Sequence, residues 1–319
     1  MDVLLRCVVL SLAAFGITHL LASMAVSSRV STRRRDEHPA LRADRLLRWQ
    51  LLPTAAAAAV LVFAAIGLFR FESREGDEVV GRTFWTAGVF GGALVLLIVV
   101  RLIRMRWQTR QLLRSWLSSA TPVALRDVAI PAFAINTGFP IVAVIGVLRP
   151  QLVIDAQVLR ACTTDELAAI LAHERGHVRR WDNLRRAAFA AVPGPWFSPD
   201  LREAWRDATE EAADDLAAAT NRDTRFHLAT ALLRVSRLAP PREAASGWQA
   251  QLPASALYRG ENIEGRVRRL VDPPTGPDHG GRPSTTALAA GLVGLVGLVG
   301  LIVQRELHDA MEYIVAFLP

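Results

Sequence analysis

Two histidines with a glutamate between them, in the segment His173-Glu-Arg-Gly-His177, have the residue types and the spacing for zinc chemistry. They lie in a run from 165 to 178 whose apolar residues recur with helical spacing, and histidines four residues apart lie one turn apart on one helical face. Both imidazoles can therefore bind one Zn²⁺, while Glu174 acts on the water that the ion activates. The alternative is a surface helix that carries two histidines by coincidence.

A catalytic zinc ion takes a third protein ligand, and a later acidic segment, Glu210-Glu-Ala-Ala-Asp214-Asp215, can supply it. Two registers are open, Glu210 with Asp214 and Glu211 with Asp215, because each pair lies one helical turn apart. In either register the glutamate binds the ion and the aspartate hydrogen-bonds a ligand imidazole, which fixes its tautomer. An exposed acidic face on an Ala-rich helix is the alternative.

The segments around these residues predict a mixed α+β unit. Residues 128–154 are rich in Val, Ile and Phe and are broken by Gly and Pro, which predicts short strands. Thr163-Thr-Asp-Glu166 has the spacing of a capping box at the start of the histidine helix. A turn over 193–199 ends that helical region, and Ser198 caps a helix that begins at Pro199 and runs to about Thr220. A further helix is predicted over 222–238.

Four apolar runs are long enough to cross a bilayer, at about 3–25, 51–69, 84–100 and 286–304. A cleaved signal peptide is the alternative for the first of them. Three runs precede the α+β unit, which occupies 104–271, and the fourth follows a flexible linker over 272–285 and leaves a tail of 305–319. The predicted fold class is therefore a polytopic α-helical membrane protein with four transmembrane helices and a zincin-like α+β metalloprotease domain.

The charge distribution predicts the orientation in the membrane. All 37 basic residues are arginines, the net charge is +7, and many of them lie in the loop 28–50 and just after the third span. The positive-inside rule places both segments in the cytoplasm, together with the α+β unit, and both termini outside. Topology thus accounts for the basic excess, and no nucleic-acid binding is expected. The two cysteines, Cys7 and Cys162, are too few and too far apart for a disulfide framework or a thiolate zinc site.

The α+β unit resembles the membrane zinc metallopeptidases of the BlaR/MecR type. The histidine motif continues as His177-Val-Arg-Arg-Trp-Asp-Asn-Leu184, similar to the H-x-x-R-x-D-N-L of that family. Upstream, Gly146-Val-Leu-Arg-Pro-Gln-Leu152 is similar to its G-x-x-x-P-x-I, with Leu152 for Ile. Downstream, Trp196-Phe-Ser-Pro199 resembles its W-F-x-P turn. The acidic segment resembles its E-x-x-C-D-E, with Ala213 for the cysteine and Asp215 for the last Glu.

This resemblance implies a gluzincin-like site that holds one Zn²⁺ per chain. It implies the ligands His173, His177 and Glu210, the catalytic Glu174, and Asp214 as the partner of a ligand imidazole. Weaker alternatives for the carboxylate positions are Glu211, Asp215 and Asp182. The family's β-lactam sensors carry a large domain after the fourth span, so a member without that sensor is expected here. The implied location is the bacterial cytoplasmic membrane, in contact with the bilayer.

The resemblance also implies the reaction, a zinc-dependent cleavage of a protein substrate in regulatory signalling. A cytoplasmic winged-helix repressor and the chain itself are the implied substrates. The strand near Ala132 to Asn136 is a candidate for binding an extended substrate by strand addition. The donor that stabilises the oxyanion is not identified, and His227, Tyr258 and several arginines are candidates.

Two other functions remain open. A quality-control or processing protease of the HtpX or CAAX-prenyl-protease type shares H-E-x-x-H and E-x-x-x-D, and Pro131-Ala-Phe-Ala134 resembles its N-A-F-A strand. A non-proteolytic transducer would use the same fold to pass a signal between membrane and cytoplasm. Because His173, Glu174, His177 and Glu210 are all present, the sequence favours an active enzyme.

Overall fold

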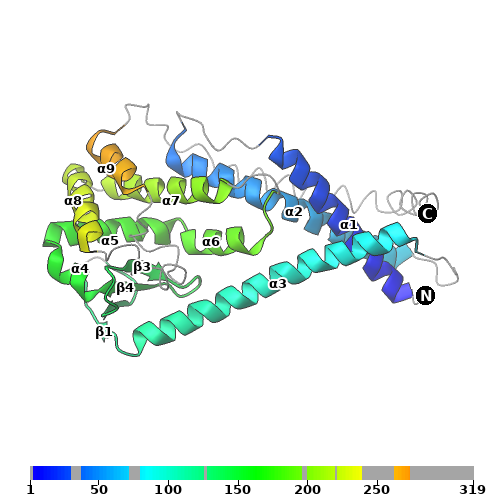
Figure 1. Cartoon of the computed structure of the whole chain (residues 1–319), viewed down its shortest axis with the longest axis horizontal. Helices are drawn as coiled ribbons and strands as arrows, with labels where there is room; N and C mark the ends of the chain where they lie inside the picture. Colours follow the sequence, from blue (N-terminus) through cyan, green and yellow to red (C-terminus); the bar gives the residue numbers. More distant parts are fainter. Residues whose placement is uncertain are drawn as a thin grey trace.

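In the part of the chain that it describes, the computed structural model has three long helices and a small α+β unit (Figure 1). It describes residues 3–29, 37–71, 80–125, 128–195, 200–219, 221–238 and 262–273. The predicted fourth span and tail, nearly all of the predicted linker, and the turn at Trp196 to Pro199 lie outside these residues.

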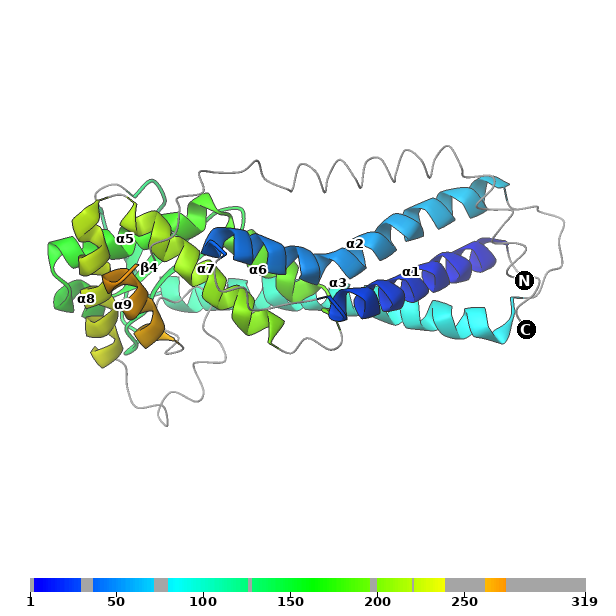
Figure 2. The same cartoon turned by 90° about the horizontal axis from the view of Figure 1, so that it is seen from above.

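The long helices are α1 (Val3–Ser27), α2 (Pro39–Phe71) and α3 (Arg82–Leu117), and each contains one of the predicted spans. All three are long and apolar enough to cross a membrane, so the chain has the features of a multi-pass membrane protein. They run side by side at one end of the molecule, as Figure 2 shows from above, and they expose large apolar side chains such as Leu21, Val62 and Val89. Such exposed side chains suit lipid better than water.

Two of these helices continue beyond the membrane-length segment into the α+β unit. The 36 residues of α3 span about 54 Å, whereas a bilayer core is about 30 Å thick. The start of α2 packs on the helices that follow, in a cluster of Ala43, Leu46, Phe189, Leu201, Trp205 and Ala208. The end of α3 packs on the sheet through Trp116. The site described below is therefore attached directly to the membrane helices (Figure 1).

The sheet has four strands in the order β1-β2-β4-β3, with β1 at Thr121–Pro122, β2 at Ala132–Ile135, β3 at Val142–Ile145 and β4 at Gln151–Asp155. β2 and β4 are parallel, and the other two pairs are antiparallel. Side chains alternate between two cores, so that Val142 and Val144 face helices while Ala143 and Ile145 face the end of α3. The expectation that β2 is free for strand addition is wrong, because β1 and β4 pair with its two sides. The edge strand beside the histidine helix is β3.

The described residues after the sheet form six further helices: α4 (Ala156–Ala161), α5 (Thr164–Arg179), α6 (Asp182–Ala191), α7 (Leu201–Ala218), α8 (Arg222–Leu238) and α9 (Ile263–Val271). α5 and α8 cover one face of the sheet in a shared apolar core. The predicted capping box of Thr163 and Glu166 is present, and α8 has the predicted bounds.

The structure differs from the predicted helices in three places. The histidine helix does not continue to the turn at 193, because Trp181 takes a left-handed conformation with φ of 56° and separates α5 from α6. α7 begins at Leu201 after the N-cap residue Asp200, later than the predicted start at Pro199. Helices α4 and α9 were not predicted.

Candidate metal centre

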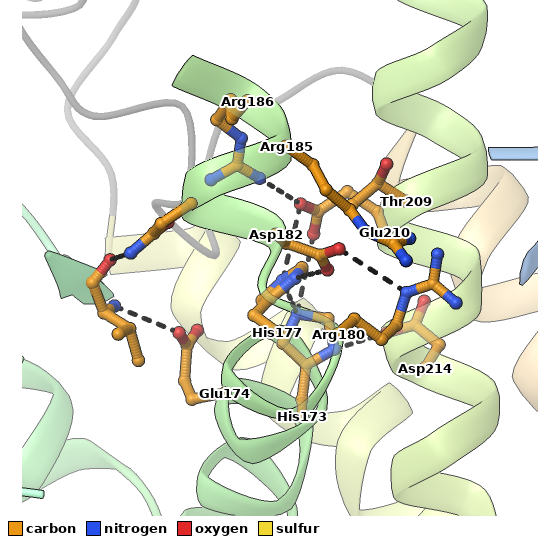
Figure 3. Close-up of polar contacts among 12 residues, drawn as sticks. His173, Glu174, His177, Arg180, Asp182, Arg185, Arg186, Thr209, Glu210 and Asp214 are labelled. Atoms are coloured by element: carbon orange, nitrogen blue, oxygen red, sulfur yellow. Dashed lines mark hydrogen bonds and ion pairs between the residues drawn. The ribbon is translucent and has the colours of Figure 1, made fainter. Parts of the chain in front are cut away.

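Helix α5 directs both histidines of the motif into the interior. His173 is fully buried and His177 is 2% exposed, and their Nε2 atoms lie 3.2 Å apart. The capping box fixes where α5 begins, and the helical repeat then places the two rings one turn apart on its inner face. The spacing of the motif thus becomes a pair of adjacent ring nitrogens (Figure 3).

Helix α7 brings a carboxylate to the same point. Oxygens of Glu210 lie 3.5 Å from Nε2 of His173 and 3.6 Å from Nε2 of His177. The two helices can come this close because Gly176 faces Ala213: a Cβ on Gly176 would lie 3.3 Å from the Ala213 Cα. Within the described residues, His173, His177 and Glu210 form a group whose ligand atoms all lie within 4.8 Å of one another.

Each histidine has a carboxylate on its other ring nitrogen. Nδ1 of His173 lies 2.9 Å from Oδ1 of Asp214, and Nδ1 of His177 lies 2.8 Å from Oδ2 of Asp182. Asp214 is one turn after Glu210 on α7. Asp182 follows the left-handed Trp181, and that reversal lets the first residue of α6 point back to α5. The sequence offered Asp182 only as a weaker alternative for a carboxylate position. In the structure it contacts His177 in the way that Asp214 contacts His173.

These contacts fit a divalent cation. A carboxylate beside each Nδ1 favours the tautomer with the proton on Nδ1, which leaves a lone pair on each Nε2. The two Nε2 atoms and the Glu210 oxygens are then acceptors that face one another, and such a group is stabilised by a positive charge between them. Their separations are close to the edge of about 3.4 Å in a tetrahedron of zinc ligands at about 2.1 Å. Two imidazole nitrogens and a carboxylate at this spacing suit Zn²⁺, so the chain's own residues can hold the ion.

The electrostatics of the centre favour a positive charge there as well. Burial acts to lower the pKa of His173, but Asp214 and Glu210 outweigh it and raise that pKa to about 9. Burial acts to raise the pKa of Glu210, yet His177, His173 and Arg266 hold it well below its usual range. The same balance, dominated by Arg266, lowers the pKa of Asp214 to about 2. A metal ion and a proton therefore compete for the same position among these side chains.

Glu174 projects from α5 toward the edge strand β3. Its side chain is 2% exposed, Oε2 accepts a hydrogen bond of 3.2 Å from the Val144 N–H, and Oε1 has no hydrogen-bond partner among the described residues. Burial raises the pKa of Glu174, although the two histidines oppose that rise. A carboxylate with a raised pKa beside a metal position is suited to accept and return a proton.

The two other acids of the α7 segment face away from the histidines. Glu211 contacts Arg42 at 3.0 Å and Arg269 at 3.2 Å, and Asp215 contacts Arg269 at 2.7 Å. In the alternative register Glu211 and Asp215 would face the metal position, and the structure does not have that arrangement.

Three residues at the centre were not singled out from the sequence. Arg266 of α9 forms a two-pronged contact with Asp214 at 2.8 and 2.7 Å and lies 3.3 Å from Glu210. Asn183 donates to the carbonyls of Val144 and Gly146, both at 2.9 Å, and so holds the end of β3 against α6. Arg186 of α6 lies 3.7 Å from Glu210. Asn183 is part of the quoted Asp-Asn-Leu motif, whereas Arg266 and Arg186 have no local signature.

Comparison with known proteins gives the family. A search of curated proteins finds no match to the chain. The family model described as BlaR1 peptidase M56 matches residues 79–266, which is more than half of the sequence and includes α3, the sheet and all the residues of the centre. The chain therefore belongs to the BlaR1 peptidase M56 family, as a membrane metallopeptidase with a candidate zinc site of the H-E-x-x-H type.

Proposed function

We propose that this chain is an integral-membrane zinc metalloendopeptidase that cleaves a protein substrate in regulatory signalling. The observation that carries the proposal is the convergence of three acceptor groups, from His173, His177 and Glu210, beside the buried carboxyl of Glu174. Membership of a peptidase family supports peptide-bond cleavage as the reaction.

The roles of the residues follow from their chemistry. Zinc bound by His173, His177 and Glu210 would supply Lewis-acid polarisation and acidify a water molecule. Glu174 accepts the proton of the attacking water and returns it to the leaving amine, and its raised pKa suits both transfers. Asp182 and Asp214 keep each imidazole in the tautomer that presents Nε2 to the ion.

The proposed location is the bacterial cytoplasmic membrane, with the α+β unit in the cytoplasm. Arg104, Arg110 and Arg114 lie on the part of α3 that approaches that unit, and Arg42 and Arg45 lie on the part of α2 that packs against it. This distribution supports a cytoplasmic site under the positive-inside rule, with both termini on the other side. The proposed substrates are accordingly a cytoplasmic winged-helix repressor and the chain itself.

A single substitution tests the proposal. Purified full-length protein in detergent, loaded with zinc, is expected to cleave fluorescent casein, and Glu174→Gln is expected to abolish cleavage while the zinc content stays at one per chain. Glu203→Gln, an exposed acid on α7, is the control that keeps activity. Casein cleavage that persists in Glu174→Gln would contradict the proposal. The inactive variant can then capture the physiological substrate in a pull-down.

A further inference from the structure

Arg186 is a charged side chain at the metal centre whose hydrogen-bond donors are largely unused. Its guanidinium enters the centre from α6 and is 14% exposed, with Nη2 3.7 Å from Oε1 of Glu210 (Figure 3). Its Nε and Nη1 atoms are buried and have no hydrogen-bond partner among the described residues. Buried donors without partners are rare in native proteins, since their desolvation is not compensated.

The neighbouring arginines have other carboxylate partners. Arg266 donates two hydrogen bonds to Asp214, and its Nη1 lies 3.3 Å from Glu210. Arg185, next to Arg186 in sequence, turns to the other side of α6 and binds Asp44 of α2 at 2.6 Å. Arg180 is shared between Asp44 and Asp182, each at 3.5 Å. Nε and Nη2 of Arg180 also lack hydrogen-bond partners among the described residues, but Arg180 lies between two carboxylates. The one ion pair of Arg186 among those residues, at 3.7 Å, joins it to Glu210 at the centre and leaves two of its donors for a ligand.

The charge of Arg186 interacts with the carboxylates of the centre. Burial acts to lower the pKa of Arg186, and the carboxylates of Glu210, Asp182 and Glu174 oppose that effect. A guanidinium stays protonated in proteins and offers several N–H donors in a rigid plane. Arg186 is thus a fixed positive charge 3.7 Å from the proposed metal ligand Glu210, and two of its N–H groups have no partner among the described residues.

We propose that Arg186 is a catalytic residue that donates hydrogen bonds to the substrate carbonyl oxygen as negative charge develops on it. This assignment rests on the proposed peptidase function and adds a donor to it. Donors that are already oriented toward a developing oxyanion stabilise the transition state more than the ground state.

The step balances without proton transfer from Arg186. The water oxygen forms a bond to the carbonyl carbon, the π electrons of the C=O bond move to its oxygen, and Glu174 accepts the proton that water loses. Arg186 donates hydrogen bonds to the resulting oxyanion. When the C=O bond re-forms, the C–N bond breaks and Glu174 returns the proton to the leaving nitrogen.

The kinetic test compares Arg186→Gln with Arg185→Gln in zinc-loaded, full-length protein on fluorescent casein. We expect Arg186→Gln to lower kcat by about 10²–10³-fold and to change KM by less than about threefold. Arg185→Gln is expected to keep kcat, because Arg185 contacts Asp44 and not the centre. Millimolar guanidinium, but not equal sodium chloride, is expected to restore part of the activity of Arg186→Ala, which a folding defect would not allow.

A binding measurement separates this role from a structural one. An N-phosphoryl dipeptide carries tetrahedral anionic oxygens that mimic the attacked carbonyl, so Arg186→Gln is expected to bind it about 10²-fold more weakly than wild type while the zinc affinity is unchanged. Wild-type kcat in Arg186→Gln, a change confined to KM, or a loss of zinc that accounts for the lost activity would each overturn the assignment. If wild type and Glu174→Gln both fail to cleave casein, the proposed function fails, and the dipeptide affinity still decides whether Arg186 binds an anion.

Discussion

Arg42 and Glu211 join a membrane-length helix to the helix that carries Glu210, the proposed metal ligand. Nη2 of Arg42, near the start of α2, lies 3.0 Å from Oε2 of Glu211 on α7. Arg269 of α9 approaches the same oxygen at 3.2 Å. Glu211 is 18% exposed, so this network is shielded from water more than most surface ion pairs. Three segments far apart in sequence therefore meet one residue away from Glu210.

This network is expected to stabilise the position of α7. Glu211→Gln should lower the unfolding free energy by about 1 kcal/mol, because partly buried ion-pair networks contribute more than isolated surface pairs. A double-mutant cycle with Arg42→Gln should give a coupling energy of about 0.5–1 kcal/mol. Thermal unfolding of the full chain in detergent measures both. Strictly additive effects would show that the contact contributes no stability.

The metal content of neighbouring variants tests the ligand register. Glu210→Gln should lose zinc, because it removes a charged ligand from between the two histidines. Glu211→Gln should keep one zinc ion per chain, since Glu211 faces Arg42 and Arg269. Elemental analysis after dialysis against a weak chelator gives the answer, and the opposite pattern would move the ligand by one residue.

Asp182 is expected to control the affinity of the centre for zinc. Asp182→Asn removes the charged acceptor of the His177 Nδ1–H, and loss of such a partner weakens metal binding by about 10–100-fold. Competition with a chromophoric chelator measures this affinity. Asp165→Asn, an exposed acid in the first turn of α5, is the control. Equal zinc affinities in the two variants would remove Asp182 from the centre.

Glu166 should make stability depend on pH. Burial acts to raise the pKa of Glu166, but the Thr163 N–H and Arg234 outweigh it, so the folded-state pKa lies below the ordinary value of 4.5. The ionised carboxylate therefore stabilises the fold above about pH 4.5, and this contribution is lost as the pH falls through the folded-state pKa. Glu166→Gln should cost about 1 kcal/mol at pH 7.

The measurement for Glu166 is the difference in unfolding temperature between wild type and Glu166→Gln across pH. The difference should shrink as the pH falls below 4.5. Asp165→Asn, on the exposed side of the same turn, serves as the control. A gap that stays constant down to acid pH would mean that packing, and not ionisation, makes Glu166 stabilising.

Gly91 is expected to be required for the packing of α1 on α3. A Cβ at this position would collide with the carbonyl oxygen of Leu12, so one helix would have to move. Gly91→Ala should destabilise the protein by about 1–3 kcal/mol. Gly92→Ala is a matched control, because its Cβ would lie 3.6 Å from the Leu12 side chain, an ordinary contact. Equal unfolding temperatures for the two variants in detergent would contradict this packing.

The sequence by itself determined the features that depend on neighbours along the chain. The capping box at Thr163 and the helical repeat after it place His173 and His177 one turn apart, and the apolar runs predict the three long helices. These interactions span one or two helical turns, so the local pattern is sufficient to predict them.

Local spacing left open which groups complete the centre, and only the family resemblance favoured Glu210 and Asp214; the tertiary structure brings them to the histidines. Glu210 and Glu211 satisfy the local spacing equally well, and the packing of Trp205 and Ala208 on α2 sets the rotation of α7 that directs Glu210 to the histidines. Asp182 reaches His177 because of the left-handed conformation of one residue, which no periodicity encodes. The partners of Arg266 and the unused donors of Arg186 depend on contacts across the whole chain. Such contacts follow from long-range packing, which the residues near each side chain do not specify.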